Sequence, residues 1–279
     1  MKTIPKKLLS YIALVLIALF VLTPLIWAFS ASITENSKVF EYAYPFTLRA
    51  FFPAEPTLDY YKYLFFEQNF LLALKNTTIL SLSTVFFSIL ISAMAGFAFA
   101  RFNFRFKNLL FIIILATSMI PLEGIIIPLY TIVKSFGWLY TWQGLIIPGL
   151  ASGFVIFLFK QFFEEIPQDL IDAAIIDGAS WFRIFSRIVL PISKPVLISG
   201  ALVVFIGTWN SFFWPLIVAP NPELRVVTVA ISASSQTEHV TIWPALFGGT
   251  VIATIVPLLL IFPFQKYYIR GIATTGIKG

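Results

Sequence analysis

The chain has 279 residues, of which 59% are hydrophobic and only 11% are charged, whereas soluble proteins carry about 25% charged residues. This composition excludes an ordinary soluble globular protein and predicts an integral membrane protein with several spans of about 20 residues each. The 19 Lys and Arg residues outnumber the 13 Asp and Glu residues, which we interpret as the basic bias of cytoplasmic loops rather than as a surface for nucleic acid.

Six apolar runs are long enough to cross a membrane and predict an all-α, polytopic fold with six transmembrane helices. In chain order they cover approximately residues 8-31, 72-99, 107-132, 141-162, 192-214 and 246-267. The first follows three lysines like a signal peptide, but its apolar core exceeds the usual length of about 7 to 15 residues, so we expect an uncleaved span. The third run contains Glu123 and counts as a crossing because its flanks are strongly aliphatic. We expect residues 1-279 to form a single transmembrane domain.

The basic residues set the predicted orientation. With a cytoplasmic N-terminus, thirteen of the 19 Lys and Arg residues fall on the cytoplasmic side and the other six fall outside. The positive-inside rule therefore places both termini in the cytoplasm, in agreement with an even number of spans.

Two connections are predicted on the outside. The longest, 35-70, is rich in aromatic residues that suit the headgroup level of a bilayer, and we expect a short interfacial helix near 57-66. The uncharged run 226-237 is too short to cross and is rich in β-branched residues, so we expect an extended loop there.

A compact charged insert, 167-191, lies between the fourth and fifth spans on the predicted cytoplasmic side. We expect two short helices. Pro167 suits the first turn of one, and Gly178 can adopt the left-handed conformation that ends it. Ser180 is a candidate N-cap for the second helix, and Pro191 limits its continuation.

The two faces of the insert differ in character. On the second helix Phe182, Phe185 and Val189 should share an apolar face that packs beneath the membrane bundle, while the other surface offers small residues with charges at the edges. An amphipathic linker lying on the membrane surface fits the same pattern. The tight corner at Gly178 favours a docking element, because a linker needs no defined corner.

The spacing of the insert closely resembles the EAA loop of ATP-binding-cassette importer permeases. The residues that carry the resemblance are Asp172, Ala173, Ala174, Asp177, Gly178, Ile188, Leu190 and Pro191. The family's usual Glu is Asp172 here, so any salt bridge at this position needs a closer approach. The segments 95-111, 119-130, 209-216 and 265-279 are similar to those of the carbohydrate-uptake, maltose-type branch of the family.

This resemblance implies a binding-protein-dependent sugar permease in a prokaryotic inner or plasma membrane. Its implied partners are a second permease, two ATP-binding-cassette ATPase subunits and an extracellular sugar-binding protein, besides the sugar and the lipid bilayer. ATP and Mg²⁺ would be bound by the ATPase subunits. In this chain the insert would form the coupling loop (residues 167-191) that seats in a groove of the ATPase.

Several chemistries have no residues to support them. The chain lacks the G-x-x-x-x-G-K-[ST] phosphate loop, and it has no cysteine and a single histidine, His239, which cannot build a common zinc site. No Ser/His/Asp set is convincing, so we expect no enzyme, no metal and no cofactor bound by this chain. A membrane enzyme or assembly factor would lack any catalytic constellation.

Polar residues inside the spans are candidates for the substrate path. Glu123 is the only acid in a predicted span, and an intramembrane carboxylate is either functional or a structural acid bonded to freed backbone groups. Trp209 and Asn210 combine an aromatic face with hydrogen-bonding groups, as in sugar sites, or serve helix packing. A gradient-driven secondary transporter that uses Glu123 is the alternative function. The small residues Ser81, Ser83, Ser88, Ser92 and Gly96 suit close helix packing.

Overall fold

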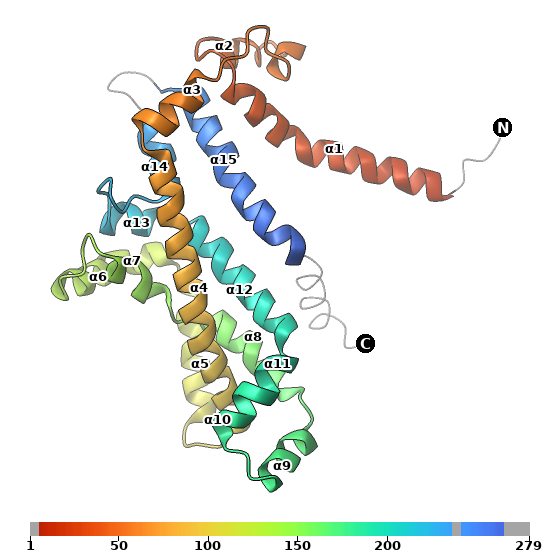
Figure 1. Ribbon diagram of the computed structural model, residues 1–279, viewed down its shortest axis with the longest axis vertical. Coiled ribbons are helices and arrows are strands. Elements are labelled where there is room, and N and C mark those ends of the chain that lie inside the picture. The colour runs from red at the N-terminus through yellow and green to blue at the C-terminus, as the bar shows by residue number, and fades with distance from the viewer. Residues whose placement is uncertain (1–5, 236–240, 265–279) are drawn as a thin grey trace. The chain divides into compact units, whose positions relative to one another are not determined.

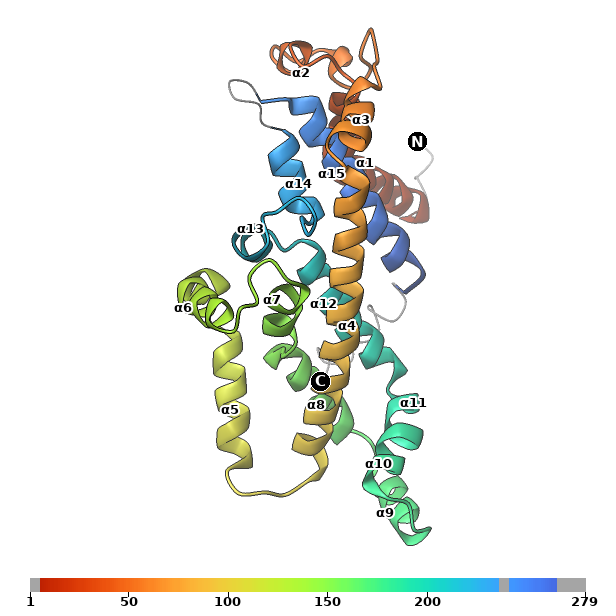
Figure 2. The same cartoon turned by 60° about the vertical axis from the view of Figure 1, so that its left-hand side comes forward.

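The computed structural model describes residues 6–235 and 241–264, and every regular element in these ranges is a helix, which confirms the predicted all-α class (Figures 1 and 2). The chain divides into two compact units. Unit 1 comprises Met1–Leu74 and Val227–Val256, and unit 2 comprises Lys75–Val226 and Pro257–Gly279. His239 and the end of the sixth predicted span, 265-267, lie outside the described residues.

The helices of unit 1 come from both ends of the sequence. They are α1 (Lys6–Ser32), α2 (Lys38–Glu41), η1 (Leu48–Ala50), α3 (Asp59–Lys62), η2 (Tyr63–Glu67), the first turn of α4 (Phe70–Arg101), α14 (Val227–Ser234) and most of α15 (Trp243–Ile261). The short helix predicted near 57-66 is present as α3 and η2.

The prediction of an extended loop at 226-237 is wrong, because α14 is a helix. A β-branched segment favours a strand only where a neighbouring strand is available to pair with it. Here the segment instead forms a helix in which Val227, Val229 and Ala230 are buried. A Cβ added at Gly249 of α15 would meet Ile231 of α14 at 2.8 Å, so these two helices are closely packed.

Polar contacts connect the sequence ends within unit 1. The Asn36 side chain donates from Nδ2 to the Thr241 carbonyl oxygen at 3.2 Å and accepts from the Trp243 backbone N–H at 2.9 Å. The Tyr60 hydroxyl accepts from the Asn36 backbone N–H at 3.0 Å. Because Trp243 is the first residue of α15, Asn36 satisfies a donor that the helix itself leaves unpaired.

Unit 2 contains most of α4 and the middle of the chain. Its further elements are α5 (Lys107–Ser118), α6 (Leu122–Ser135), α7 (Trp142–Ile146), η3 (Ile147–Gly149), α8 (Gly153–Glu164), α9 (Gln168–Ile176), α10 (Trp181–Ile184), η4 (Phe185–Val189), α11 (Leu190–Ile192), α12 (Lys194–Trp209), α13 (Phe213–Val218), the end of α15 and η5 (Phe262–Phe264).

The core of unit 2 is built around α8. Phe159 and Phe163 of α8 are fully buried in an apolar cluster that includes residues of α4, α9, α10 and α12. A Cβ added at Gly96 of α4 would lie 2.7 Å from the Phe159 Cβ, and one at Gly200 of α12 would lie 3.0 Å from the Phe159 ring. Both helices therefore approach α8 closely through glycine, and the predicted packing role of Gly96 is confirmed.

Membrane-crossing candidates occur as straight helices and as bent pairs. By length and composition, α1, α4 and α15 with η5 are each sufficient to span. Three pairs meet the same test jointly, α5 with α6, α7–η3 with α8, and α10–α11 with α12, with bends of 102°, 44° and 82°. Six crossings result if each pair is one span. The third predicted span is therefore broken before Pro121, since the residue before proline is disfavoured in helical conformation.

Candidate coupling loop and polar sites of unit 2

The first helix of the coupling loop ends in a defined corner. Helix α9 begins at Gln168, so Pro167 occupies its N-cap rather than its first turn. At its end Gly178 has φ +75°, which confirms the left-handed conformation expected there. The Gly178 N–H donates to the Ile175 carbonyl at 2.9 Å and the Ala179 N–H donates to the Ala174 carbonyl at 2.9 Å. This pair of bonds is a Schellman motif, which satisfies the last carbonyls of the helix.

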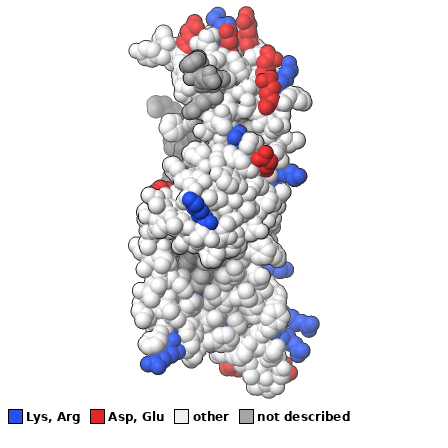
Figure 3. All heavy atoms as spheres, turned by 90° about the vertical axis from the view of Figure 1, so that its left-hand side faces the viewer, with Lys and Arg blue, Asp and Glu red and all other residues white. Residues whose placement is uncertain are grey.

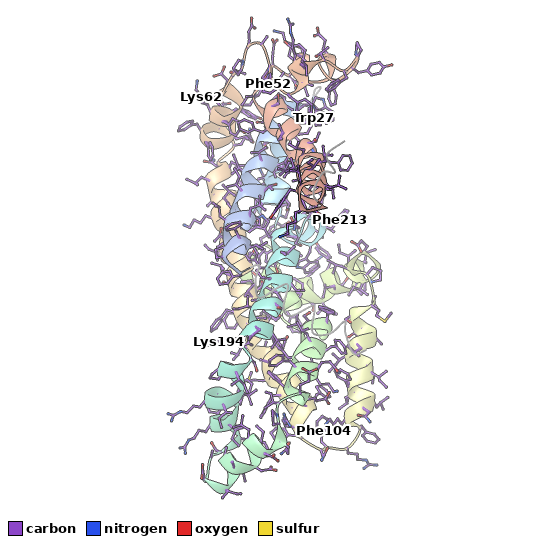
Figure 4. The ribbon with its side chains drawn as sticks, turned by 90° about the vertical axis from the view of Figure 1, so that its right-hand side faces the viewer. Trp27, Phe52, Lys62, Phe104, Lys194 and Phe213 are labelled. Atoms are coloured by element: carbon purple, nitrogen blue, oxygen red, sulfur yellow. The ribbon has the colours of Figure 1, made fainter. Side chains whose placement is uncertain are left out.

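The second helix starts as expected and then changes its winding. The Ser180 hydroxyl accepts from the Arg183 N–H at 3.4 Å, which confirms the N-cap. A π-turn, η4, follows α10, and the helix ends at Ile192, one residue beyond Pro191. The lysine that starts α12, Lys194, lies beside this end of the loop, and Phe104 lies at the same end of unit 2 (Figure 4).

The π-turn changes which residues face the core. The expectation that Phe182 shares a buried face with Phe185 and Val189 is wrong, because Phe182 is 74% exposed and Ile184 is fully buried instead. A π-turn inserts a residue relative to α-helical spacing, so residues before and after it no longer follow the three-to-four residue repeat. Ile184, Phe185 and Val189 together attach this arm to the core of unit 2.

The outer surface of the coupling loop is apolar and rimmed by charge. Ile176 is 85% exposed, and Ile175, Trp181 and Phe182 are also exposed. Asp172, Ala173, Asp177 and Gly178 are exposed as well, whereas Ala174 is buried. Figure 3 shows Lys and Arg side chains gathered at the end of unit 2 that carries α9 and α10. An exposed apolar patch with a charged rim is typical of a protein contact surface.

Other residues of the loop serve the interior. Ile188 and Leu190 are partly buried against the core cluster. Asp172 accepts a hydrogen bond at 2.9 Å from Nε2 of Gln168, one turn before it on α9. The structure therefore divides the predicted coupling residues into an exposed group, which includes Asp172 and Ala173, and a group packed against the core, which includes Ala174 and Ile188.

The three substrate-path candidates have different environments. Trp209 is 2% exposed and stacks on Phe205 with ring centroids 5.5 Å apart. Asn210 donates from Nδ2 back to the Ile206 carbonyl of its own helix at 3.0 Å. Glu123 lies exposed in the first turn of α6, and no ion pair or hydrogen bond joins its side chain to the described residues. A carboxylate at a helix N-terminus is favoured by the helix dipole.

A cavity of about 170 Å³ lies in unit 2 among α4, α6, α7–η3, α12 and α13. Its lining includes Leu80, Thr84, Gly149, Gly207, Ser211 and Trp214. Thr84 is 3% exposed, and its buried Oγ1 has no hydrogen-bond partner among the described residues. The volume is sufficient for water. The sequence groups Trp214 with Trp209 and Asn210 as an aromatic and polar set, and Trp214 lines the cavity together with Ser211, which sequence reasoning missed.

Further buried hydroxyls follow one side of α4. Ser81, Ser88 and Ser92 are fully buried, and like Thr84 their oxygens have no partner. Their spacing of three to four residues places them on one face, which is the face that packs inward with Gly96. Among the described residues, no group of three or more His, Cys, Asp or Glu side chains is arranged to hold a metal ion.

Comparisons with known proteins agree with this architecture. Over 231 residues the chain is 32% identical to the arabinooligosaccharides transport system permease protein of Halalkalibacterium halodurans, covering 82% of each chain. It is 30% identical to the trehalose/maltose transport system permease protein of Thermococcus litoralis over 98% of each chain. It is also 30% identical to the sulfoquinovosyl glycerol transport system permease protein of Agrobacterium fabrum, over 98% of this chain and 94% of the relative.

A solved structure shares the fold. It is the crystal structure of a bacterial ABC transporter involved in the import of the acidic polysaccharide alginate, with a TM-score of 0.77, 21% identity and coverage of 94% of this chain and 95% of the matched chain. Residues 62–273 match the family described as binding-protein-dependent transport system inner membrane component. This chain therefore belongs to the family of inner-membrane permease components of binding-protein-dependent ABC transport systems.

Proposed function

We propose that this chain is the membrane-spanning subunit of an ATP-driven sugar importer that is coupled to its ATPases through the coupling loop. The observation that carries the proposal is the exposed apolar surface around Ile176, held on a rigid corner whose other side is buried in the core of unit 2. The carbohydrate names of the relatives support a sugar as the solute.

In this proposal the chain works within an assembly. A second permease completes the translocation path, an extracellular binding protein delivers the sugar, and two ATPase subunits bind ATP and Mg²⁺. Both termini and the coupling loop face the cytoplasm of a prokaryotic cell, and Glu123, Trp209 and Asn210 remain proposed residues of the substrate path. Asp172 and Asp177 give the docking surface a negative rim toward the ATPase.

The packing supports a mechanical role for the loop. Ile171 and Ile184 are fully buried and lie in one cluster with Phe159 and Phe163 of α8. Because close-packed interiors transmit displacement instead of absorbing it, movement of the docking surface would carry the inner ends of the spans with it. Closure of the ATPases on ATP would thus switch the path between inward and outward openings.

Reconstitution tests the proposal. The chain is co-purified with its partner permease and ATPases, placed in liposomes, and supplied with binding protein and ATP. Maltose, trehalose and arabinooligosaccharides are the first probes, because relatives carry these names. We expect ATP-dependent accumulation of at least one carbohydrate, lost when the binding protein is omitted. Accumulation that needs neither ATP nor binding protein would contradict the proposal.

The same liposomes discriminate the alternative. A gradient-driven transporter would move solute with this chain alone under a pH gradient, and Glu123→Gln would abolish that movement. The importer predicts no uptake by the chain alone. It also predicts that any uptake by the assembled Glu123→Gln transporter still requires ATP and binding protein and does not respond to a pH gradient, because the Glu123 carboxylate has no ionisable partner among the described residues with which to form a proton path.

A further inference from the structure

A single guanidinium, that of Arg101 at the end of α4, joins three segments of unit 2. Its Nη2 donates to the backbone carbonyl oxygens of Phe163 and Ile166, at the point where α8 ends and the chain turns toward the coupling loop. Its Nη1 donates to Oε1 of Gln168, the first residue of α9, at 2.8 Å. A cation at a helix C-terminus satisfies the carbonyls that the helix leaves unpaired and complements its dipole.

Gln168 connects Arg101 to Asp172 on the exposed surface of the coupling loop through two hydrogen bonds. Its amide accepts from Arg101 through Oε1 and donates through Nε2 to Oδ1 of Asp172 at 2.9 Å. Only a side chain that carries both an acceptor and a donor can connect an arginine to a carboxylate in this way. The result is a chain of hydrogen bonds from the end of a membrane helix to the exposed acid of the coupling loop.

The same end of α4 holds the other arm of the loop through aromatic contacts. Phe102 meets Trp181 edge to face, with ring centroids 4.9 Å apart. Phe97 lies 5.2 Å from Phe185 and 6.2 Å from Trp181, centroid to centroid. Residues 97 to 102, at the end of α4 and just beyond it, therefore contact α9 through the Arg101 guanidinium and α10 through packed aromatic rings.

We propose that Arg101 and Gln168 are positioning residues, which fix Asp172 relative to α4 so that displacement of the coupling loop is delivered to that span. The inference rests on the proposed function for its consequence in transport. The arginine is suited to this role because its planar guanidinium holds five N–H donors in a fixed geometry, whereas the lysine ammonium is a compact charge on a flexible stem.

The first test is a distance measurement that needs no sugar. The chain has no cysteine, so spin labels attach only at introduced positions. Met94 of α4 and Ile176 of α9 are both exposed and serve as label sites. We expect one narrow distance distribution for the labelled permease complex, and a broadened or shifted one in Arg101→Lys and in Gln168→Ala. An unchanged distribution in both variants would overturn the proposal, whether or not the complex imports sugar.

The second test separates positioning from support of the fold. Gln168→Glu retains an acceptor for Arg101 but cannot donate to Asp172 and repels it instead. We expect sugar imported per ATP hydrolysed to fall about threefold to tenfold, the factor that corresponds to the net free energy of one hydrogen bond. The thermal midpoint and the yield of co-purified ATPase should remain at the wild-type level. An unchanged import ratio, or a loss that follows a lowered midpoint, would overturn the positioning role.

Arg105→Ala is the matched control. Arg105 lies in the same connection after α4, and its guanidinium rests on the Phe106 ring at 4.7 Å. Removing it takes away a positive charge near the loop without touching the connection to Asp172, so we expect the import ratio to stay unchanged. A decrease equal to that of Gln168→Glu would show that general positive charge, and not the specific connection, sustains coupling, and would overturn the proposal.

Discussion

Trp214 donates its indole N–H to the backbone carbonyl oxygen of Gly144 at 3.0 Å, across 70 residues of sequence. The bond is needed because the helical partner of that carbonyl would be the N–H of residue 148, which is a proline and has none. Trp214 is 6% exposed, so the contact lies away from solvent. Helix α13 thus satisfies a backbone group that the bend after α7 leaves unpaired.

Replacing Trp214 by Phe tests this bond. The ring is largely retained, but the Gly144 carbonyl becomes a buried acceptor without a partner, which costs about 1–3 kcal/mol. We expect a lower midpoint of thermal unfolding for the purified chain in detergent. Phe213→Leu, at a neighbouring exposed position, should leave the midpoint nearly unchanged. Equal midpoints for Trp214→Phe and wild type would contradict the assignment.

The glycine at the other end of this bond is required for space. A Cβ at Gly144 would lie 2.2 Å from the backbone oxygen of Trp138, whereas a Cβ at Gly207 would meet nothing within 4 Å. We expect Gly144→Ala to reduce the yield of folded protein and lower the thermal midpoint. Gly207→Ala, in the interior of α12, should preserve or raise it because alanine favours helix. A lower thermal midpoint for Gly207→Ala than for Gly144→Ala would be evidence against this packing.

At Gly178 the backbone and not the available space limits substitution. Its φ is +75° and a Cβ would meet no atom within 4 Å, so bulk alone is accommodated. A β-branched residue in the left-handed region is strained, at a cost of about 1–2 kcal/mol, while asparagine tolerates this region. We expect Gly178→Val to insert normally but to lower ATP-driven uptake, and Gly178→Asn to retain most of it. Equal uptake by both variants would argue against a rigid corner.

Asn36 connects two parts of unit 1 and offers a graded test. Asn36→Ala removes both bonds to the start of α15 and leaves the Trp243 N–H and the Thr241 carbonyl unpaired, so we expect a loss of about 1–3 kcal/mol in stability. Asn36→Asp retains the acceptor for Trp243 and should lose less. Thermal unfolding of the two variants measures the order. A larger loss of stability in Asn36→Asp than in Asn36→Ala would contradict the assigned hydrogen bonds.

The ion pair of Glu35 and Lys38 predicts a pH effect outside the membrane. A hydrogen bond from Lys38, at 2.8 Å, lowers the pKa of the Glu35 carboxyl below its ordinary value. The pair therefore contributes stability above the ordinary Glu pKa, and this contribution is lost as pH falls through the lowered pKa. The contribution is small because both groups are exposed. Carboxyl NMR titration should show a higher pKa for Glu35 in Lys38→Met, and an identical titration would contradict the assignment.

Local rules were enough to predict the corner of the coupling loop. The left-handed Gly178 and the Ser180 cap follow from the conformational preferences of these residues, and the apolar runs follow from composition. Segment 227–234 was misjudged because β-branched residues formed a helix once α15 offered an apolar face. Phe182 was expected to be buried, but Ile184 is buried in its place. The apolar pattern of the sequence does not reveal where a π-turn occurs. The contacts of Arg101 join residues 62 to 67 positions apart, so no local pattern could reveal them.

Cross-linking from the coupling loop tests the central claim most directly. In this cysteine-free chain, Ile176→Cys carries a photoreactive maleimide at a position that is 85% exposed, and Ile127→Cys, at 76% exposure on α6, is the control. In membranes that contain the assembled transporter, we predict a cross-linked product between residue 176 and an ATP-hydrolysing subunit, with none from residue 127. Illumination that leaves the ATPase free of adducts from residue 176, or that labels it equally from both positions, would contradict the account.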